Sequence, residues 1–200
     1  MKYREIAKMA IKKYDIAVHS LTFLAEETNV FYLLGSGESA FVMKIFQEAS
    51  SDINDNLTEH FLISTLLDKT EIKTPKVIRN KHGETVTKIA FPNPRGYKRV
   101  ALYEYIEAEA VDGQENMEYF RTVGGLIAKM HIATENLKFP EHVNPKKWED
   151  IFYYENETPV YHKKKYKRFI TQEMISILDE LIPYINEKLK LFYTNMTPRL

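Results

Sequence analysis

The sequence of 200 residues contains no cysteine, few glycines and no excess charge of either sign. Without cysteine, disulfides, thiolate nucleophiles and zinc–cysteine sites are excluded, and a cytoplasmic location is the natural expectation. Basic and acidic residues number 28 each, which argues against nucleic acid or an anionic membrane as a partner held by bulk charge. No apolar signal core follows the charged N-terminus, and no apolar run approaches the length of a membrane span.

The glycines also exclude two common phosphate-binding motifs. There are 7 of them, and their positions allow neither G-x-G-x-x-G nor G-x-x-x-x-G-K-[ST]. The first motif cradles the pyrophosphate of dinucleotides, and the second cradles the phosphates in P-loop proteins. A nucleotide site in this chain would therefore have to be built in another way.

One stretch combines a strongly apolar strand pattern with a single charge. In Ser39–Phe46, alternate residues fall on opposite faces of a strand, so that Met43 and Ile45 share one face while Val42, Lys44 and Phe46 share the other. An ammonium group in such a run must find an anion or reach water, because burying it alone is too costly.

The anion is predicted to come from the following helix. Residues 57–66 have helical spacing, and Glu59 shares a face with Leu62, Ile63 and Leu66. The simplest pairing is therefore Lys44 with Glu59. These two residues alone favour a functional site no more than a structural ion pair, or a lysine that extends to water from an edge strand.

The order of the predicted elements indicates an α+β protein. Strands are expected at 20–25, 29–34, 39–46, 77–79, 84–91 and 99–106, and helices at 3–14, 51–69, 115–134 and 171–192. The strands at 77–79 and 84–91 are expected to form a hairpin. Two features of the later helices stand out: Gly124 and Gly125 suggest a close backbone contact, and Pro183 is expected to kink or split its helix. The change from strands to helices predicts a domain boundary at residues 106 and 107.

This order resembles a protein-kinase-like fold, and six segments make the resemblance more specific. They occur in the order typical of the phosphotransferase superfamily, which includes aminoglycoside phosphotransferases, choline kinases and homoserine kinases. The six segments are Thr28-Asn29-Val-Phe, Phe41-Val-Met-Lys44-Ile, Glu59 with Leu66, Thr74-Pro75-Lys-Val-Ile, Leu102-Tyr-Glu-Tyr-Ile106 and Gly125-Leu-Ile-Ala-Lys-Met-His131. The resemblance covers roughly residues 17–134 and weakens towards the C-terminus.

The resemblance implies a small lobe in residues 1–106 and an incomplete helical large lobe in residues 107–200. It also implies that Lys44 contacts the α- and β-phosphates of ATP while Glu59 holds it in place. The backbone of Glu104-Tyr105-Ile106 would form the hinge that binds adenine. The loop that contains Thr28 and Asn29 would lie over the phosphates. ATP and a small molecule with a hydroxyl group are the implied partners.

The sequence departs from the superfamily in one important respect. The superfamily's catalytic loop reads roughly H-x-D-x-x-x-x-N, followed by an aspartate that binds magnesium, and none of the 6 histidines here is followed two residues later by aspartate. The catalytic residues and the magnesium ligands are therefore expected beyond residue 200, and the chain is interpreted as the N-terminal part of a longer kinase. The alternative is a kinase-like binding module without catalysis. Homoserine-like, amino-sugar and choline-like acceptors all stay open, as does the oligomeric state.

Overall fold

A computed structural model describes residues 3–47, 51–90, 96–108, 116–145, 159–166 and 168–195. The chain divides into two compact units, Met1–Asn144 and Pro145–Leu200. The first unit contains α1 (Tyr3–Ile11), β1 (Ser20–Glu26), β2 (Asn29–Ser36), β3 (Ser39–Phe46), α2 (Ile53–Lys69), β4 (Val77–Ile78), β5 (Thr87–Ala90), β6 (Tyr97–Glu104) and α3 (Met117–Thr134). The boundary predicted between residues 106 and 107 divides the small lobe from the large lobe of a kinase-like fold, and it stays a prediction.

The six described strands of the first unit form one antiparallel sheet. Its order is β1-β2-β3-β6-β4, and β5 also pairs with β6. The β2–β3 turn follows the sequence prediction: Ser36 pairs with Ser39, and Gly37 adopts a positive φ of 61°. Glycine adopts this conformation at little steric cost. The turn fixes the register of β2 against β3, in which Phe31 lies opposite Lys44.

The prediction that residues 77–79 and 84–91 form a hairpin is wrong. Both β4 and β5 pair with β6, β4 beside residues 102–103 and β5 beside residues 97–100. Between them, the amide of Gly83 donates to the carbonyl of Asn80, and the side-chain oxygen of Asn80 accepts from the backbone of His82 and Glu84. This turn is stable without strand pairing across it, because the asparagine side chain takes up the donors that a hairpin ladder would have used.

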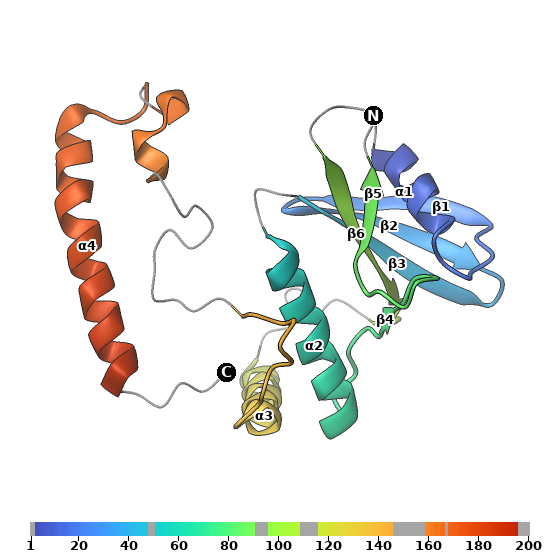
Figure 1. The fold of residues 1–200 in the computed structure, drawn as a ribbon. Helices are drawn as coiled ribbons and strands as arrows, with labels where there is room; N and C mark the ends of the chain where they lie inside the picture. The colour runs from blue at the N-terminus through green and yellow to red at the C-terminus, as the bar shows by residue number, and fades with distance from the viewer. Residues whose placement is uncertain are drawn as a thin grey trace. The chain divides into compact units, whose positions relative to one another are not determined.

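Helices α1 and α2 cover opposite faces of the sheet (Figure 1). Met43 and Ile45 of β3 pack into the larger core under α1, whereas Phe46 packs with Ala101 and Tyr103 on the face covered by α2. The predicted alternation along β3 is therefore confirmed. It places the apolar side chains of one face in the α1 core and turns Lys44 towards α2.

The start of α2 is fixed by its own first residues and by β6. Asp52 is the N-cap, and it forms a capping box with Asp55, in which each side chain accepts from the other residue's backbone amide. The buried guanidinium of Arg99, on β6, donates to the side chain of Asn56 and to the carbonyl of Ser51. These bonds tie the first turn of α2 to the sheet and so set the position of Glu59 further along the helix.

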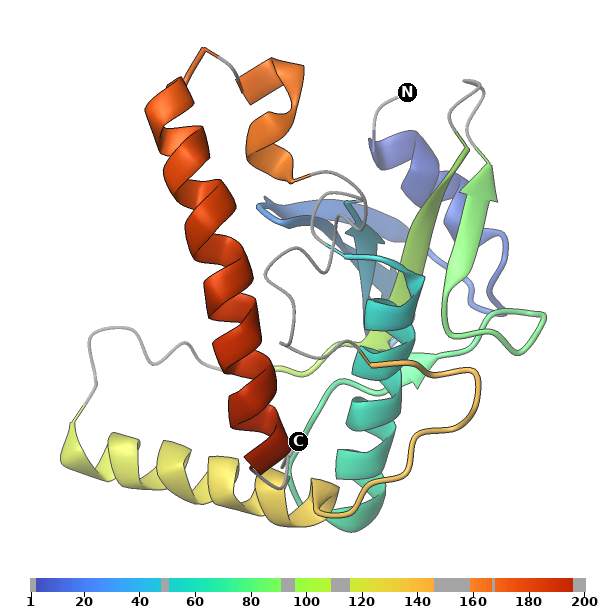
Figure 2. The same ribbon diagram turned by 60° about the vertical axis from the view of Figure 1, so that its left-hand side comes forward.

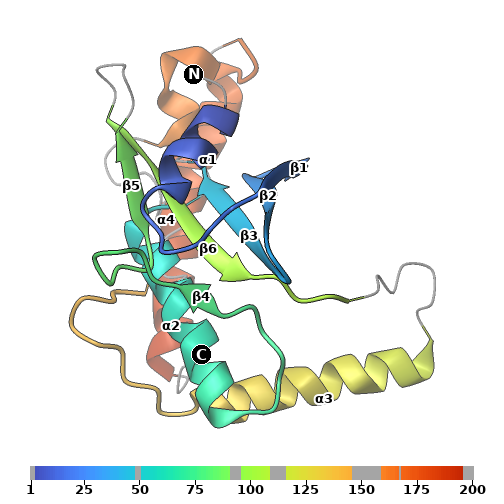
Figure 3. The same ribbon diagram turned by 90° about the vertical axis from the view of Figure 1, so that its right-hand side faces the viewer.

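Helix α3 meets the rest of the first unit at its C-terminal end. The end of α3 lies beside the end of α2 (Figures 2 and 3), where the ammonium of Lys69 donates to the carbonyl of Ala133 at 3.2 Å. The close backbone contact expected at Gly124 and Gly125 is absent from the described residues, because no atom lies within 4 Å of a Cβ built at either position. Several apolar side chains of α3 are exposed: Met117, Phe120, Leu126, Ile127, Met130 and Ile132.

The second unit contains two short 3₁₀ helices, Val160–His162 and Lys164–Tyr166, and α4 (Gln172–Asn195). Helix α4 continues through Pro183, so the expected split does not occur. Asp179 of α4 accepts hydrogen bonds from Tyr161 at 2.8 Å and from His162 at 2.7 Å, and these two donors hold the pKa of the aspartate below its usual value. None of the described helices is both long and apolar enough to cross a membrane.

Candidate nucleotide-binding site

Lys44 and Glu59 form the ion pair that the sequence predicts. The ammonium of Lys44 lies 2.9 Å from Oε1 and 2.8 Å from Oε2 of Glu59, so it contacts both carboxylate oxygens. The lysine side chain is 16% exposed and the glutamate side chain is 36% exposed. The ammonium also lies 4.9 Å from the centre of the Phe46 ring, over the face of the ring, where a cation is attracted. The pair is thus partly shielded but still open to a ligand.

The local structure explains why the pair forms. Lys44 faces Ala101 on β6, and the small side chain of this fully buried alanine leaves space beside the sheet for the long lysine. Glu59 lies one turn before Ile63, which packs against the cluster of Phe46, Ala101 and Tyr103. Packing of Ile63 therefore turns the same face of α2, with Glu59 on it, towards β3.

The ion pair forms part of the wall of a pocket of about 420 Å³. This volume lies within the range of small-molecule sites. Five predicted site residues line the pocket, and the lining also includes apolar side chains from three strands or their ends. The lining residues are Phe31, Val42, Lys44, Glu59, Ile63, Pro75, Tyr103, Glu104, Tyr105 and Ile106. The structure therefore brings Lys44 and Glu59 together with the predicted hinge.

Two of the hinge amides already have partners in the fold. The amide of Glu104 donates to the carbonyl of Lys76 at 2.8 Å, and the amide of Tyr105 donates to the carbonyl of Ala40 at 3.0 Å. These bonds fix the backbone as it leaves β6. In the described part of the chain, the amide of Ile106 makes no such bond, so it is the backbone donor of the predicted hinge that is open to a ligand.

The structure places Thr28 and Asn29 at the turn between β1 and β2, and neither residue lines the pocket. The side-chain amide nitrogen of Asn29 lies 3.5 Å from the hydroxyl of Thr28. The side-chain oxygen of Asn29 accepts from the backbone amide of Gln47 at 3.3 Å. Asn29 thus joins the start of β2 to the end of β3. The proposed contact of this turn with phosphates stays a prediction.

Two further residues belong to the site, and the sequence analysis did not assign them a role. The hydroxyl of Tyr103 lies 3.1 Å from Oε1 of Glu59, and Nε2 of His60 lies 2.9 Å from the same hydroxyl. Both residues stand next to predicted site residues in the sequence: Tyr103 lies inside the segment 102–106 that carries the resemblance, and His60 directly follows Glu59. Their hydrogen bonds could not be predicted, because sequence spacing does not show which side chains of a helix and a sheet meet.

Burial controls the charge state of both residues. Burial lowers the pKa of His60 from 6.5 to about 4, the Glu59 carboxylate opposes this change and Lys44 adds to it. Burial, followed by the nearby Glu59 carboxylate, raises the pKa of Tyr103 above its usual value of 10.0. At neutral pH the imidazole and the phenol are therefore both uncharged, and the ion pair carries the only formal charges of this group of four side chains.

A second cavity, of about 590 Å³, lies along the side of α2 next to β4. It is larger than the pocket at the ion pair, but neither Lys44 nor Glu59 lines it. Among the described residues, no group of three or more histidine, cysteine, aspartate or glutamate side chains is arranged to hold a metal ion. The pocket at the ion pair is therefore the candidate site, with one oriented cation, one backbone donor and an apolar wall.

Comparison with known proteins finds matches for the fold of this chain but none for its sequence. No family model matches the sequence, and no curated protein matches it either. Solved structures do match. An amicoumacin kinase in complex with AMP-PNP and Ca²⁺ matches with a TM-score of 0.69 and 18% identity, over 99% of this chain and 55% of that one.

A microcompartment-associated aminopropanol kinase matches with a TM-score of 0.62 and 17% identity, over 94% of this chain and 58% of that one. The chain has a kinase-like phosphotransferase fold. A spectinomycin phosphotransferase in complex with ADP and spectinomycin has the same fold, with a TM-score of 0.50 and 13% identity, over 98% of this chain and 59% of that one. The phosphotransferase fold and its α+β class, expected from the sequence, are confirmed, and the chain spans just over half the length of these structures.

Proposed function

We propose that this chain is the ATP-binding part of a phosphotransferase that phosphorylates a hydroxyl group of a small molecule. The observation that carries the proposal is the Lys44–Glu59 pair in the wall of a pocket that ends at the hinge. A lysine held at both carboxylate oxygens is a positive charge with a fixed direction, as a polyphosphate requires. The fold that the chain shares with nucleotide-bound kinases supports the same assignment.

We propose separate positions for the adenine ring and for the phosphates of ATP. The adenine ring would lie between Val42 and the hinge, where the amide of Ile106 donates to the base. The phosphates would extend towards Lys44, with the turn that contains Thr28 and Asn29 above them. Val42 and Phe31 give this pocket an apolar wall, which suits a planar base because burying its faces releases water.

Magnesium would accompany the nucleotide phosphates, and among the described residues no group of three or more histidine, cysteine, aspartate or glutamate side chains is arranged to hold it. Nucleotide phosphates and water usually supply most Mg²⁺ ligands, with one or two carboxylates from the protein. Glu59 is engaged by Lys44 and Tyr103, so its carboxylate does not fit that role. No catalytic step is therefore assigned to residues of this chain. These residues do not identify the acceptor of the phosphate either.

Replacing Lys44 tests the proposal directly. We expect Lys44→Ala to weaken binding of ATP at least about tenfold, because hydrogen bonds between charged groups contribute about 1.5–3 kcal/mol each. Isothermal titration calorimetry with ATP and Mg²⁺ measures this on the full chain.

Lys81→Ala is the matched control, since it removes a lysine whose ion pair with Asp15, at 3.5 Å, lies outside the pocket. The control should bind ATP as the unchanged protein does. Equal ATP affinity in Lys44→Ala and in the unchanged protein would show that the site is assigned wrongly.

A second candidate function is a kinase-like module that binds a ligand without catalysis. One observation favours it: the sequence contains no H-x-D-x-x-x-x-N segment. This chain alone is expected to bind ATP without transferring phosphate under either candidate, so a phosphotransfer assay on the protein isolated from its native cells, with a panel of amino alcohols and amino sugars, separates the two. Nucleotide binding without any transfer would favour the binding module, and transfer to any acceptor would exclude it.

A further inference from the structure

Four side chains are joined by hydrogen bonds that run from the interior to the pocket. Nε2 of His60 lies 2.9 Å from the hydroxyl of Tyr103, and that hydroxyl lies 3.1 Å from Oε1 of Glu59. Both oxygens of Glu59 accept from the ammonium of Lys44, at 2.9 and 2.8 Å. His60 and Tyr103 are 5% and 6% exposed, so the inner two of these four side chains are shielded from water.

Chemistry fixes the direction of each bond. A carboxylate paired with an ammonium only accepts, so the hydroxyl of Tyr103 must donate its single proton to Glu59. The phenol oxygen can then only accept from His60, which therefore carries its proton on Nε2. The other imidazole nitrogen, Nδ1, would then be unprotonated, and it is buried without a hydrogen-bond partner in the described part of the chain.

We infer that Tyr103 is a positioning residue for the nucleotide site, and that His60 orients it. The inference rests on the proposed function. Tyr103 fixes Oε1 of Glu59, and Glu59 in turn fixes the ammonium of Lys44. Without the phenol, a carboxylate that is 36% exposed could turn towards water and take the ammonium with it.

The place of Tyr103 in the sequence gives it a second link to the site. It directly precedes Glu104-Tyr105-Ile106 and lines the pocket itself. A single residue of β6 therefore joins the end of the pocket where the hinge lies to the end where the ion pair lies. A shift of the backbone at residues 104–106 would move the phenol, and with it the carboxylate that holds the cation.

A purely structural role for Tyr103 is the alternative. Its ring packs with Phe46 and Ala101, and it meets the imidazole of His60 edge-on with ring centres 5.6 Å apart. A structural role predicts that removal of the hydroxyl lowers the stability of the fold and leaves nucleotide affinity unchanged. A positioning role predicts a loss of affinity as well.

The test compares two tyrosine-to-phenylalanine variants that each remove one buried, hydrogen-bonded hydroxyl. Tyr103→Phe removes the link to Glu59. Tyr14→Phe removes the acceptor for the hydroxyl of Thr87, at 2.9 Å, in the core on the other face of the sheet. We expect Tyr103→Phe to weaken ATP binding about fivefold or more, as loss of a hydrogen bond to a charged group would. Tyr14→Phe should lower the melting temperature but leave ATP affinity within about twofold of the unchanged protein, because a neutral hydrogen bond distant from the ligand affects folding alone.

A second measurement does not depend on ATP. Nitrogen-15 NMR of His60 in the unliganded chain should show a protonated Nε2 and an unprotonated Nδ1, and Tyr103→Phe should change the Nε2 signal. A proton on Nδ1 would overturn the direction of the bonds, and ATP affinity unchanged by Tyr103→Phe would overturn the positioning role. If the unchanged protein binds no ATP, the proposed function fails and the positioning role with it, while the NMR result still decides the bonding pattern.

Discussion

Replacing Arg99 with methionine should destabilise the first unit by about 2 kcal/mol or more, because two acceptor oxygens lose their donor at a cost of about 1–3 kcal/mol each. Arg99 is 5% exposed, and its guanidinium donates both to the side chain of Asn56 and to the carbonyl of Ser51. Methionine fills a similar volume, so the loss would come from the hydrogen bonds rather than from a cavity. Urea denaturation followed by circular dichroism measures it.

The same change should also affect the nucleotide site. Asn56 is 1% exposed and lies one turn of α2 before Glu59. Without Arg99, the oxygen of this asparagine has no charged donor, and the first turn of α2 can move away from β6. We therefore expect Arg99→Met to weaken ATP binding together with stability.

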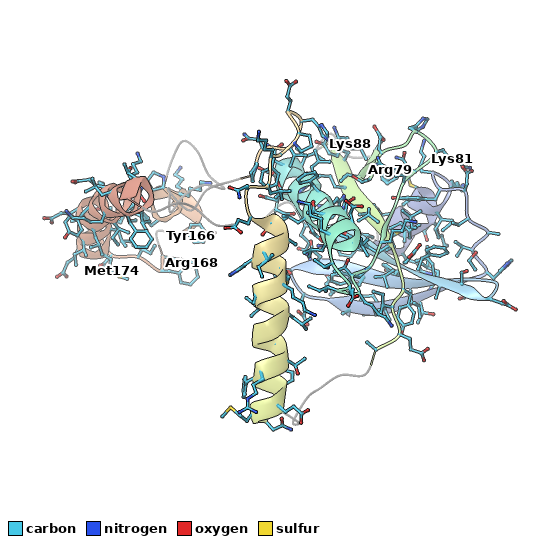
Figure 4. All side chains as sticks on the ribbon, turned by 90° about the horizontal axis from the view of Figure 1, so that it is seen from below. Arg79, Lys81, Lys88, Tyr166, Arg168 and Met174 are labelled. Atoms are coloured by element: carbon cyan, nitrogen blue, oxygen red, sulfur yellow. The ribbon has the colours of Figure 1, made fainter. Side chains whose placement is uncertain are left out.

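Arg79→Met provides the control for Arg99→Met. Arg79, labelled in Figure 4, is an exposed arginine that donates to the carbonyl of Gly83 at 2.7 Å. An exposed hydrogen bond of this kind contributes little, so a change of less than about 1 kcal/mol is expected. Equal effects of the two substitutions would contradict the structural role given to Arg99.

Acidification should remove about 3 kcal/mol of stability through His60 between pH 7 and pH 4, because one pKa unit corresponds to about 1.36 kcal/mol. Burial lowers the pKa of His60 in the folded state to about 4, from 6.5 in the unfolded chain. Between these values the unfolded state binds a proton that the folded state does not. The contribution is therefore complete above pH 6.5 and is lost as the pH falls towards 4.

The charged groups around His60 do not change this sign. Glu59 favours the protonated imidazole, Lys44 opposes it, and Tyr103 presents a neutral hydroxyl to Nε2. His60→Gln isolates the effect, because the glutamine amide can donate to Tyr103 but does not titrate. The free energy of unfolding, measured in urea at several pH values, should fall more steeply with acid in the unchanged protein than in this variant. Parallel curves would exclude the buried histidine as the cause.

The sequence was sufficient to predict the central part of the site. A single lysine in an apolar strand needs an anion or water, and Glu59 lies on the face of the next helix that its apolar residues define. The strands and helices of the first unit also followed from apolar periodicity and turn residues. These signals are local, so each can be interpreted within a window of a few residues.

The features that were missed all depend on contacts distant in sequence. The 77–79 and 84–91 segments have the composition of a hairpin, but β6 offers both of them a longer partner strand. Tyr103 and His60 lie 43 positions apart, and only the fold brings the hydroxyl to the imidazole.

The attachment of α3 by one end has a consequence for its local stability. Of its 18 residues, Ala133 and Thr134 are buried, both at the end that meets α2. An isolated helix of this length is marginal in water, and each internal glycine costs about 1 kcal/mol relative to alanine. The amides in the first half of α3 should therefore exchange with solvent deuterium far faster than those of α2. The same half should be the first site that a protease cuts, until another surface covers its apolar side chains.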